Sequence, residues 1–254
     1  MQKNYEREVQ SVTSPRSEKL SQRRPVKAAR GKPYVVMPSA EKAPYVPKKR
    51  YAYRFVKRVC DIISSGLFLI VFSWLFIIIS LIIKLGDGGK VIYKQPRIGK
   101  GGKHIYISKF RSMKPNADKL EDMLTPEQLE QYRREFKLDN DPRITKIGKF
   151  LRKTSLDELP QVWDVFVGRL SVVGPRPLLE DELREKYGSD AQKLLSVKPG
   201  IIGWWAVNGR SNVTYESGER QRLELYYVDH CSLMFDAKIL FKAIVSVVKR
   251  DGAK

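Results

Sequence analysis

Two adjacent carboxylates, Asp157 and Glu158, lie in an unusually basic part of the sequence. The surrounding segment, residues 141–177, contributes seven cations: Arg143, Lys146, Lys149, Arg152, Lys153, Arg169 and Arg176. Cations hold an anionic substrate, while a carboxylate can attack it as a nucleophile or bind a bridging divalent metal ion. We expect Asp157 to be ionised at neutral pH, because free aspartic acid has a pKa of about 3.9. The spacing therefore indicates chemistry on an anionic substrate.

The same two acids also fit a purely structural interpretation. Ser155, followed three residues later by Glu158, matches the capping box that starts a helix, so both acids would decorate a helix N-terminus. Pro160 weakens this interpretation, because a proline at the fifth position lacks the N–H that the helix needs. Proline prefers the first turn, and the alternative is a helix that begins nearer Pro160. Spacing alone leaves both interpretations open.

Arg176 lies in the stiff sequence Gly174-Pro175-Arg176-Pro177. The flanking prolines restrict the backbone on both sides of the arginine. A preorganised guanidinium binds phosphate through two hydrogen bonds with less loss of entropy than a free one. A plain connecting loop is the alternative interpretation.

The paired tryptophans, Trp204 and Trp205, lie between turn signals at 198–200 and 207–210. They fit a hydrophobic core, a membrane-interface anchor, or a surface that stacks on a base. The glycine-rich segment 99–103 lacks the spacing of a Walker loop, which argues against a kinase or an ATPase. No Gly-x-Ser-x-Gly elbow occurs, which argues against a serine hydrolase of that kind.

The charge balance narrows the class of partner. Among 254 residues, 48 Lys and Arg face 28 Asp and Glu, which gives a formal net charge of +20. Such an excess attracts nucleic acid, anionic lipid head groups or phosphorylated small molecules, and does not choose among them. Cys60, Cys231, His104 and His230 show no metal-ligand spacing. The two separated cysteines indicate a reducing compartment and argue against a disulfide scaffold.

An uncharged run from Ile62 to Ile83 has roughly the 20 residues that a helix needs to cross the hydrocarbon core of a bilayer. Basic residues flank the run on both sides, and such flanks favour the cytoplasmic face. A re-entrant hairpin keeps both flanks inside, whereas a fully spanning helix does not. Residues that offer a hinge or backbone caps at depth are Ser64, Ser65, Gly66 and Ser73.

We favour the re-entrant arrangement and divide the chain into three parts. Residues 1–50 are polar, basic and rich in proline, and are expected to form a flexible extension. Residues 51–85 form the membrane-inserted helix. Residues 86–254 form a cytoplasmic catalytic domain of the α/β class, mostly helical, with amphipathic helices at the membrane interface.

Several elements of this domain have local signals. Residues 103–111 alternate polar and apolar side chains, as a half-buried strand does. Thr125, Pro126 and Gln128 form a helix start, and the helix is expected to continue to about residue 138. Apolar residues recur at helical spacing over 239–248, with basic residues between them. That helix fits either the membrane interface or ordinary core packing.

Seven of these segments, taken in order, resemble the bacterial sugar transferase family, in its small monotopic form of polyprenyl-phosphate phosphoglycosyl transferases. The resemblance covers roughly residues 51–254, and one segment alone would be a weak signal. The matching residues are Lys57, Arg58 and Asp61; the uncharged membrane run; Gln95, Arg97 and Gly99; and the segments 109–113, 156–161, 174–177 and 199–204 through 208–210.

The resemblance implies a transferase that moves a sugar-1-phosphate from a UDP-sugar to undecaprenyl phosphate and releases UMP. Asp157 matches the nucleophile that carries the phosphosugar covalently. Glu158 matches the second acid, which helps to hold Mg²⁺ or manages the proton of the acceptor, so both acids are the predicted metal ligands. The predicted substrate-binding residues are Lys109, Arg111, Arg152, Arg176, Asn208, Arg210 and Asp236.

The resemblance also implies a place and partners. The enzyme is expected at the cytoplasmic face of the bacterial plasma (inner) membrane, at the first membrane step of capsule, O-antigen, exopolysaccharide or glycoprotein synthesis. No nucleic acid partner is expected, and a homodimer is compatible with the family. The sugar and the pathway are not specified by the sequence.

Three positions depart from the family pattern. Trp74 follows Ser73 where the family usually has proline, so the membrane helix lacks its strongest breaker. Asp164 stands where asparagine is common, and Ala206 where glutamine is common. Two other functions stay open at this stage: a membrane-tethered module that binds polyanions, and a lipid-linked phosphatase that uses the same aspartyl chemistry.

Overall fold

The computed structural model describes residues 45–46, 50–117, 119–135, 138, 140–209, 215 and 217–248. The predicted N-terminal extension, except Tyr45, Val46 and Arg50, lies outside the described residues. Over the described part the chain is mostly helical with two small sheets. The predicted α/β class with a helical majority is therefore confirmed.

The uncharged run forms two helices, α2 (Tyr51–Val71) and α3 (Ser73–Asp87), which meet at Phe72. The two axes are inclined by 62°. The break occurs without proline: Phe72 leaves the helical conformation, with φ −101° and ψ 12°, and the Ser73 hydroxyl donates to the Ile70 carbonyl at 3.0 Å. Of the four residues considered for a hinge, Ser73 lies at the break, whereas Ser64, Ser65 and Gly66 lie inside α2. No single described helix is long and apolar enough to cross a bilayer, and only this bent pair passes by length and composition.

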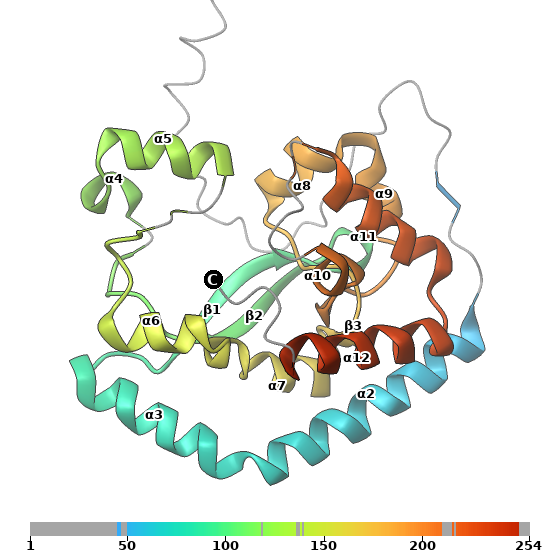
Figure 1. The fold of residues 1–254 in the computed structure, drawn as a ribbon, viewed down its shortest axis with the longest axis horizontal. Helices are drawn as coiled ribbons and strands as arrows, with labels where there is room; N and C mark the ends of the chain where they lie inside the picture. Colours follow the sequence, from blue (N-terminus) through green and yellow to red (C-terminus); the bar gives the residue numbers. More distant parts are fainter. Residues whose placement is uncertain are drawn as a thin grey trace, which may run out of the picture. The chain divides into compact units, whose positions relative to one another are not determined.

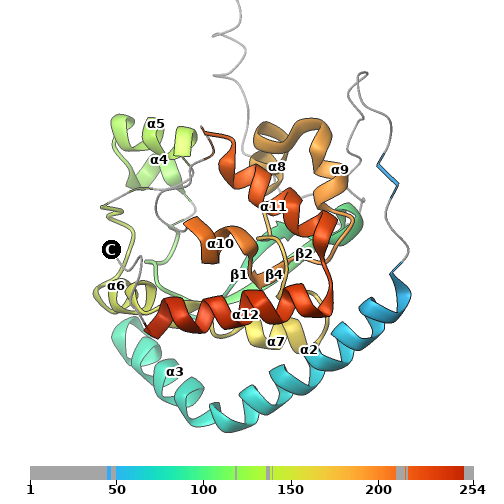
Figure 2. The ribbon, with the colours of Figure 1, turned by 45° about the vertical axis from the view of Figure 1, so that its right-hand side comes forward.

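Both helices of the pair have one side against the domain and one side exposed (Figures 1 and 2). Asp61 and Ser65 of α2 and Ile79 and Ile83 of α3 are buried. The exposed side is almost entirely apolar and includes Phe55, Val59, Ile62, Ile63, Leu67, Ile70, Val71, Trp74, Ile77, Ile78, Leu81, Ile82 and Leu85.

Two short sheets support the domain. Strands β1 (Ile92–Ile98) and β2 (His104–Phe110) form an antiparallel hairpin in which Gln95 pairs with Ile107. The strand predicted over 103–111 is thus confirmed. The hairpin turn η3 (Lys100–Gly102) places Gly101 at a φ of +69°, which suits glycine. Strands β3 (Ser171–Val173) and β4 (Gly200–Ile202) pair in parallel.

The other helices surround these sheets (Figure 1). The predicted helix start is confirmed, because the Thr125 N–H donates to the Gln128 side chain and the Gln128 N–H donates to the Thr125 hydroxyl. That helix is described only to Glu135. The remaining elements are α4 (Leu120–Met123), α5 (Pro126–Glu135), α6 (Lys146–Lys153), η4 (Leu156–Glu158), α7 (Gln161–Phe166), α8 (Glu180–Tyr187), η5 (Gly188–Asp190), α9 (Ala191–Leu194), α10 (Trp204–Gly209), α11 (Glu219–His230) and α12 (Leu233–Val248).

Helix α12 combines the two environments considered for it. Ile239 is fully buried, and packs in one cluster with Val173 and Tyr227. Phe241 and Ile244 on the same helix are exposed. One face of α12 therefore belongs to the core, while its apolar character continues onto the surface.

The core explains one of the two tryptophans. The ring of Trp204 lies 4.8 Å from that of Phe235 and joins the same cluster as Tyr227. Trp205 instead lies under the guanidinium of Arg220, 4.4 Å from the ring centre. Trp204 therefore has a packing role, in agreement with the core interpretation.

Candidate active site

The two candidate acids lie on η4, a single 3₁₀ turn between α6 and α7. Ser155 precedes the turn in the left-handed conformation, with φ +57°, and its side chain caps nothing among the described residues. The capping box considered for Ser155 is therefore not formed. Helix α7 begins only at Gln161, directly after Pro160, as the alternative predicted. The acids are displayed on a tight turn and do not belong to a longer helix.

The turn gives the two carboxylates different environments. Asp157 is buried, at 7% exposure, whereas the Glu158 side chain is 38% exposed. Burial raises the pKa of Asp157 above its ordinary value; Lys109 opposes this shift, Glu158 adds to it, and Arg152 opposes it. The ordinary value of free aspartic acid is therefore a lower bound for Asp157 in the fold, because desolvation disfavours the charged carboxylate.

Two of the predicted cations meet the acids. Lys109, near the end of β2, places its Nζ 2.8 Å from Oε1 of Glu158. Arg152, in the last turn of α6, acts electrostatically on Asp157 and donates from Nε to the Ser112 hydroxyl at 2.9 Å. The structure therefore brings Lys109, Arg152, Asp157 and Glu158 together, and we call these four residues the acid–base cluster.

Helix α6 is held in place by its first turn. Thr145 accepts the Gly148 N–H at 2.9 Å as the helix cap, and its own N–H donates to the Ser112 carbonyl at 3.1 Å. Gly148 is required here, because a Cβ would come within 1.9 Å of the Ser112 carbonyl oxygen. Ser112 thus fixes α6 at both ends, through its carbonyl at the first turn and its hydroxyl at Arg152.

The segment after the acids is fixed through Asp164, which is fully buried in α7. Its carboxylate accepts the backbone N–H of Ser108 at 2.6 Å, next to Lys109 in β2, and pairs with Arg169 at 2.8 Å. The aspartate that replaces the commoner asparagine therefore has a cationic partner of its own. This contact ties the strand that carries Lys109 to the helix that follows the acids.

Two further predicted arginines lie in other surroundings. The guanidinium of Arg111 packs against Gly89, so closely that a Cβ at position 89 would lie 2.2 Å from Nη1 of Arg111. Arg176 has an exposed side chain, and its backbone N–H donates to the buried Glu224 at 3.2 Å. The pKa of the buried Arg97 is lowered to about 10, mainly by its burial and next by repulsion from the Arg176 guanidinium. No described contact joins either arginine directly to Asp157.

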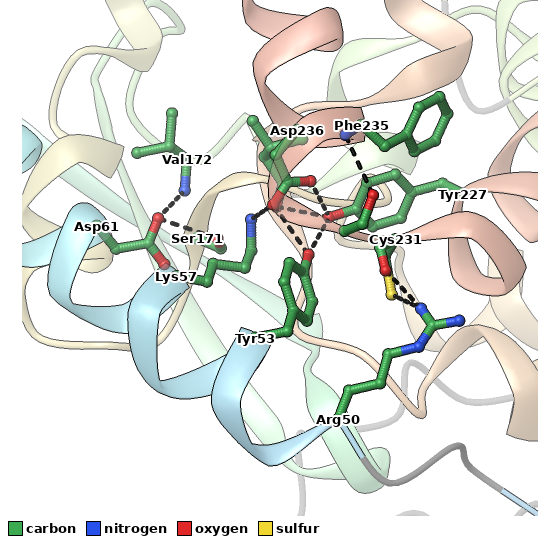
Figure 3. Close-up of polar contacts among 12 residues, drawn as sticks. Arg50, Tyr53, Lys57, Asp61, Ser171, Val172, Tyr227, Cys231, Phe235 and Asp236 are labelled. Carbon is green, nitrogen blue, oxygen red and sulfur yellow. Dashed lines mark hydrogen bonds and ion pairs between the residues drawn. The ribbon is translucent and has the colours of Figure 1, made fainter.

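Asn208, Arg210 and Asp236 were the remaining predictions. The Asn208 side chain donates to the Trp204 carbonyl and accepts from Lys242, both at 2.7 Å, which ties α10 to α12. Arg210 lies outside the described residues. Asp236, in the first turn of α12, is buried and receives bonds from Tyr53 at 2.9 Å, Lys57 at 2.7 Å and Tyr227 at 2.8 Å (Figure 3). Among the described residues its contacts belong to this second cluster and not to the acid–base cluster.

Contacts that spacing along the chain did not predict join α2 to the domain. Arg58 donates from its two terminal nitrogens to the carbonyls of Val165 and Phe166, each at 2.7 Å, at the end of α7. Asp61 accepts from the Ser171 hydroxyl at 3.1 Å and the Val172 N–H at 3.0 Å (Figure 3). Both residues are in the entry motif of the resemblance, and their spacing puts them on one helix face, which was the available signal.

The acids fit Mg²⁺ in one specific way. No group of three or more described His, Cys, Asp or Glu side chains converges to hold a metal ion. Mg²⁺ commonly uses only one or two carboxylates and completes its shell with water and substrate phosphates. Asp157 and the more exposed Glu158 are the pair of hard oxygen donors that could hold it.

Comparisons with known proteins identify the family of this chain. The model of a family described as bacterial sugar transferase matches residues 52–250. An uncharacterised sugar transferase of Haemophilus influenzae is 45% identical over 203 residues, 79% of this chain and 42% of its own. An undecaprenyl-phosphate galactose phosphotransferase of Salmonella typhimurium is 44% identical over the same shares. The exopolysaccharide production protein ExoY of Rhizobium meliloti is 40% identical over 222 residues, 85% of this chain and 97% of its own.

The lengths of these relatives differ. The chain spans less than half of the Haemophilus and Salmonella proteins, and nearly all of the ExoY protein. The match nevertheless includes the acid–base cluster, both sheets and the bent helix pair. The chain belongs to the bacterial sugar transferase family.

Proposed function

We propose that the chain transfers a sugar-1-phosphate from a UDP-sugar to undecaprenyl phosphate and releases UMP. The observation that carries the proposal is the buried carboxylate of Asp157, next to the half-buried Glu158 and within electrostatic reach of Lys109 and Arg152. Relatives named undecaprenyl-phosphate galactose phosphotransferase and UDP-glucose:undecaprenyl-phosphate glucose-1-phosphate transferase support the choice of donor and acceptor.

The reaction proceeds in two displacements at one phosphorus atom. An oxygen of Asp157 attacks the phosphorus that carries the sugar, the bond between the two phosphates breaks, and UMP leaves with the electron pair. A phosphate oxygen of undecaprenyl phosphate then attacks the same phosphorus, and Asp157 departs as a free carboxylate. The products are UMP and a sugar linked to the lipid through a diphosphate.

Burial of Asp157 suits a nucleophile. A carboxylate with little water around it needs less desolvation before it attacks, and its raised pKa reflects a more basic oxygen. The attack brings two anions together, which costs about 4 kcal/mol per pair of unit charges at 4 Å with an effective dielectric of 20. Lys109 and Arg152 offset this repulsion, and Mg²⁺ held by Asp157 and Glu158 would neutralise charge on the phosphates.

The bent helix pair supplies the membrane attachment in this proposal. The exposed apolar side of α2 and α3 enters the bilayer as a re-entrant hairpin, and the domain lies at the cytoplasmic face of the plasma membrane. The relatives in exopolysaccharide production support a role in envelope polysaccharide synthesis. A site at the lipid surface lets a soluble donor and a lipid acceptor reach the same aspartate in turn.

The test is the Asp157→Asn variant of the full chain, assayed with a panel of UDP-sugars, Mg²⁺ and undecaprenyl phosphate. Asparagine keeps the size of the side chain and removes the nucleophilic charge, so we expect UMP release to fall by at least 10³-fold. Asp181→Asn is the matched control, because Asp181 is an exposed acid paired with Arg184 on α8. The wild-type protein without acceptor lipid should release one equivalent of UMP and gain the mass of one sugar phosphate.

Two results would overturn the proposal. Wild-type turnover that yields UDP would place the cleaved bond elsewhere and exclude an aspartyl phosphosugar. Undiminished UMP release by Asp157→Asn would remove Asp157 as the nucleophile.

A further inference from the structure

A cavity of about 190 Å³ lies between the first half of α2 and the domain, apart from the acid–base cluster. Its walls come from α2, the η3 turn around Lys100, the segment 196–198 before β4, and the end of α11. None of the four residues of the acid–base cluster lines it. Figure 3 shows the side chains of Tyr53, Lys57 and Asp61 on α2, and that of Arg50 directly before the helix, with their contacts to the domain.

The walls of the cavity are strongly basic. Asp61 is the single acid among the lining residues, and its carboxylate already accepts hydrogen bonds from Ser171 and Val172. Six cations line the same space: Arg50, Arg54, Lys57, Arg58, Lys100 and Lys198.

Three of the six cations are used within the protein. Arg50 donates to the carbonyls of Cys231, at 2.6 Å, and Asp229, at 2.7 Å. Lys57 pairs with Asp236, and Arg58 donates to the carbonyls that end α7. These contacts fix the shape of one wall.

The other three cations, Arg54, Lys100 and Lys198, have no hydrogen-bond or ion-pair partner for their side chains among the described residues. They come from three separate segments of the chain and face one cavity. Burial, followed by repulsion from Arg54, lowers the pKa of Lys100; burial, followed by repulsion from Arg58, lowers the pKa of Lys198. Arg54 and Lys198 are half-buried and Lys100 is exposed at the rim. Gathering like charges in this way is unfavourable unless an anion lies between them.

We propose that this cavity binds a phosphate group, at a site separate from the one where the transfer reaction takes place. Arg54, Lys100 and Lys198 are the ligating residues. The volume is smaller than the roughly 300 Å³ at which pockets for drug-sized ligands begin, so it suits a phosphate-sized anion and not a whole nucleotide sugar. Flexible lysines at turns and an arginine on a helix are common phosphate ligands.

Two sources can supply this group: free phosphate, or the head group of an anionic lipid. Helix α2, which forms one wall of the cavity, also carries the exposed apolar residues Tyr51, Phe55 and Val59, which do not line the cavity. A lipid with its head in the cavity would find an apolar surface on this helix. The inference does not depend on the proposed transfer reaction, because it concerns binding in the absence of a UDP-sugar.

The experiment compares three forms of the purified full chain: wild type, Lys100→Ala/Lys198→Ala, and Lys103→Ala/Lys119→Ala. The control pair removes the same charge from exposed lysines that do not line the cavity. Each form is titrated calorimetrically with inorganic phosphate and, separately, with monomeric dihexanoyl phosphatidylglycerol. Thermal unfolding is measured in phosphate-free buffer and in phosphate.

We expect wild type and control to bind alike, and the cavity variant to bind at least tenfold more weakly. In phosphate-free buffer the cavity variant should unfold at the same or a higher temperature than wild type, because it has lost repulsion. Binding of both probes identifies any accessible phosphate as the ligand, whereas binding of the lipid alone identifies a lipid head group. Equal binding by the cavity variant and wild type, or no binding of either probe to wild type, overturns the inference.

Discussion

The close approach of Gly148 to Ser112 predicts that a single methyl group will disturb the acid–base cluster from a distance. In Gly148→Ala the new Cβ would begin 1.9 Å from the Ser112 carbonyl oxygen and 2.6 Å from its carbon. Ordinary contact begins at 3.4 Å, so the helix and the Ser112 backbone must separate by 3.4 − 1.9 = 1.5 Å along this direction. Backbone lies on both sides, so rotation of a side chain cannot relieve the clash.

The displacement has two expected effects. Overpacking of this kind costs about 1–3 kcal/mol of stability. It also moves α6 and with it Arg152, whose Nε donates to the Ser112 hydroxyl at 2.9 Å. The positive charge of Arg152 acts on the carboxylate of Asp157. Because a misplacement of about 1 Å in a catalytic group can cost on the order of 10²-fold in rate, we expect UMP release to fall by about that factor.

The assay pairs the rate of UMP release with chemical unfolding of the same protein. Gly66→Ala is the matched control, since its Cβ would meet only the ring of Phe166, at 3.3 Å, and alanine favours a helix. We expect that control to keep activity within about twofold and to gain up to about 1 kcal/mol. If Gly148→Ala is as stable as the wild type and releases UMP at the same rate, Ser112 does not support α6 in the way that its contacts indicate.

Three further predictions concern buried acids. Burial raises the pKa of Asp157, so the fold disfavours its charged form, and Asp157→Asn should be at least as stable as wild type at pH 7.5 in thermal unfolding. Burial raises the pKa of Glu224 from 4.5 to about 8, so the free energy of unfolding of the wild type should fall as the pH rises between these values. The slope of this fall is at most about 1.4 kcal/mol per pH unit. Glu224→Gln should flatten the slope. Asp61→Ala leaves two donors without their acceptor and should cost about 2–6 kcal/mol in chemical unfolding, whereas Asp61→Asn keeps an acceptor oxygen and should cost less than half as much.

Each of these has a result that contradicts it. Loss of more than 1 kcal/mol in Asp157→Asn would mean that its charge stabilises the fold. An unchanged pH profile in Glu224→Gln would show that Glu224 is ionised in the fold at neutral pH. Equal losses in Asp61→Ala and Asp61→Asn would assign the effect to the charge, and not to the bonds from Ser171 and Val172.

Features set by a few neighbouring residues were predictable from the sequence. Thr125 and Gln128 satisfy each other's backbone donors, so their spacing sufficed to place a helix start. A break at Ser73 was the favoured alternative to a fully spanning helix, and the chain does break there although the hinge has no proline. Pro160 correctly indicated that the two acids precede a helix, because its missing N–H acts locally.

Long-range pairing was not predictable, because spacing along the chain contains no information on which segments meet. Asp61 reaches Ser171 over 110 positions, and although the entry motif marks Asp61, the local sequence does not specify Ser171 as its partner. The environment of Asp157 was missed for the same reason, since its desolvation depends on distant elements. Asp236 was identified through the resemblance alone, and only the fold shows its bonds to Tyr53 and Tyr227.

The bonds from Tyr53 and Lys57 to Asp236 have a consequence for the order in which the chain assembles during synthesis. They join residues 183 and 179 positions apart. At about 5–20 residues per second, a ribosome makes Asp236 roughly 10–40 s after Tyr53. During this interval α2 has neither its buried acidic partner nor the tyrosine of α11, while its apolar side is already complete. A nascent chain therefore exposes an apolar helix long before the residue that binds this helix to the domain is made. Early insertion into a bilayer or binding by a chaperone would protect the helix from aggregation.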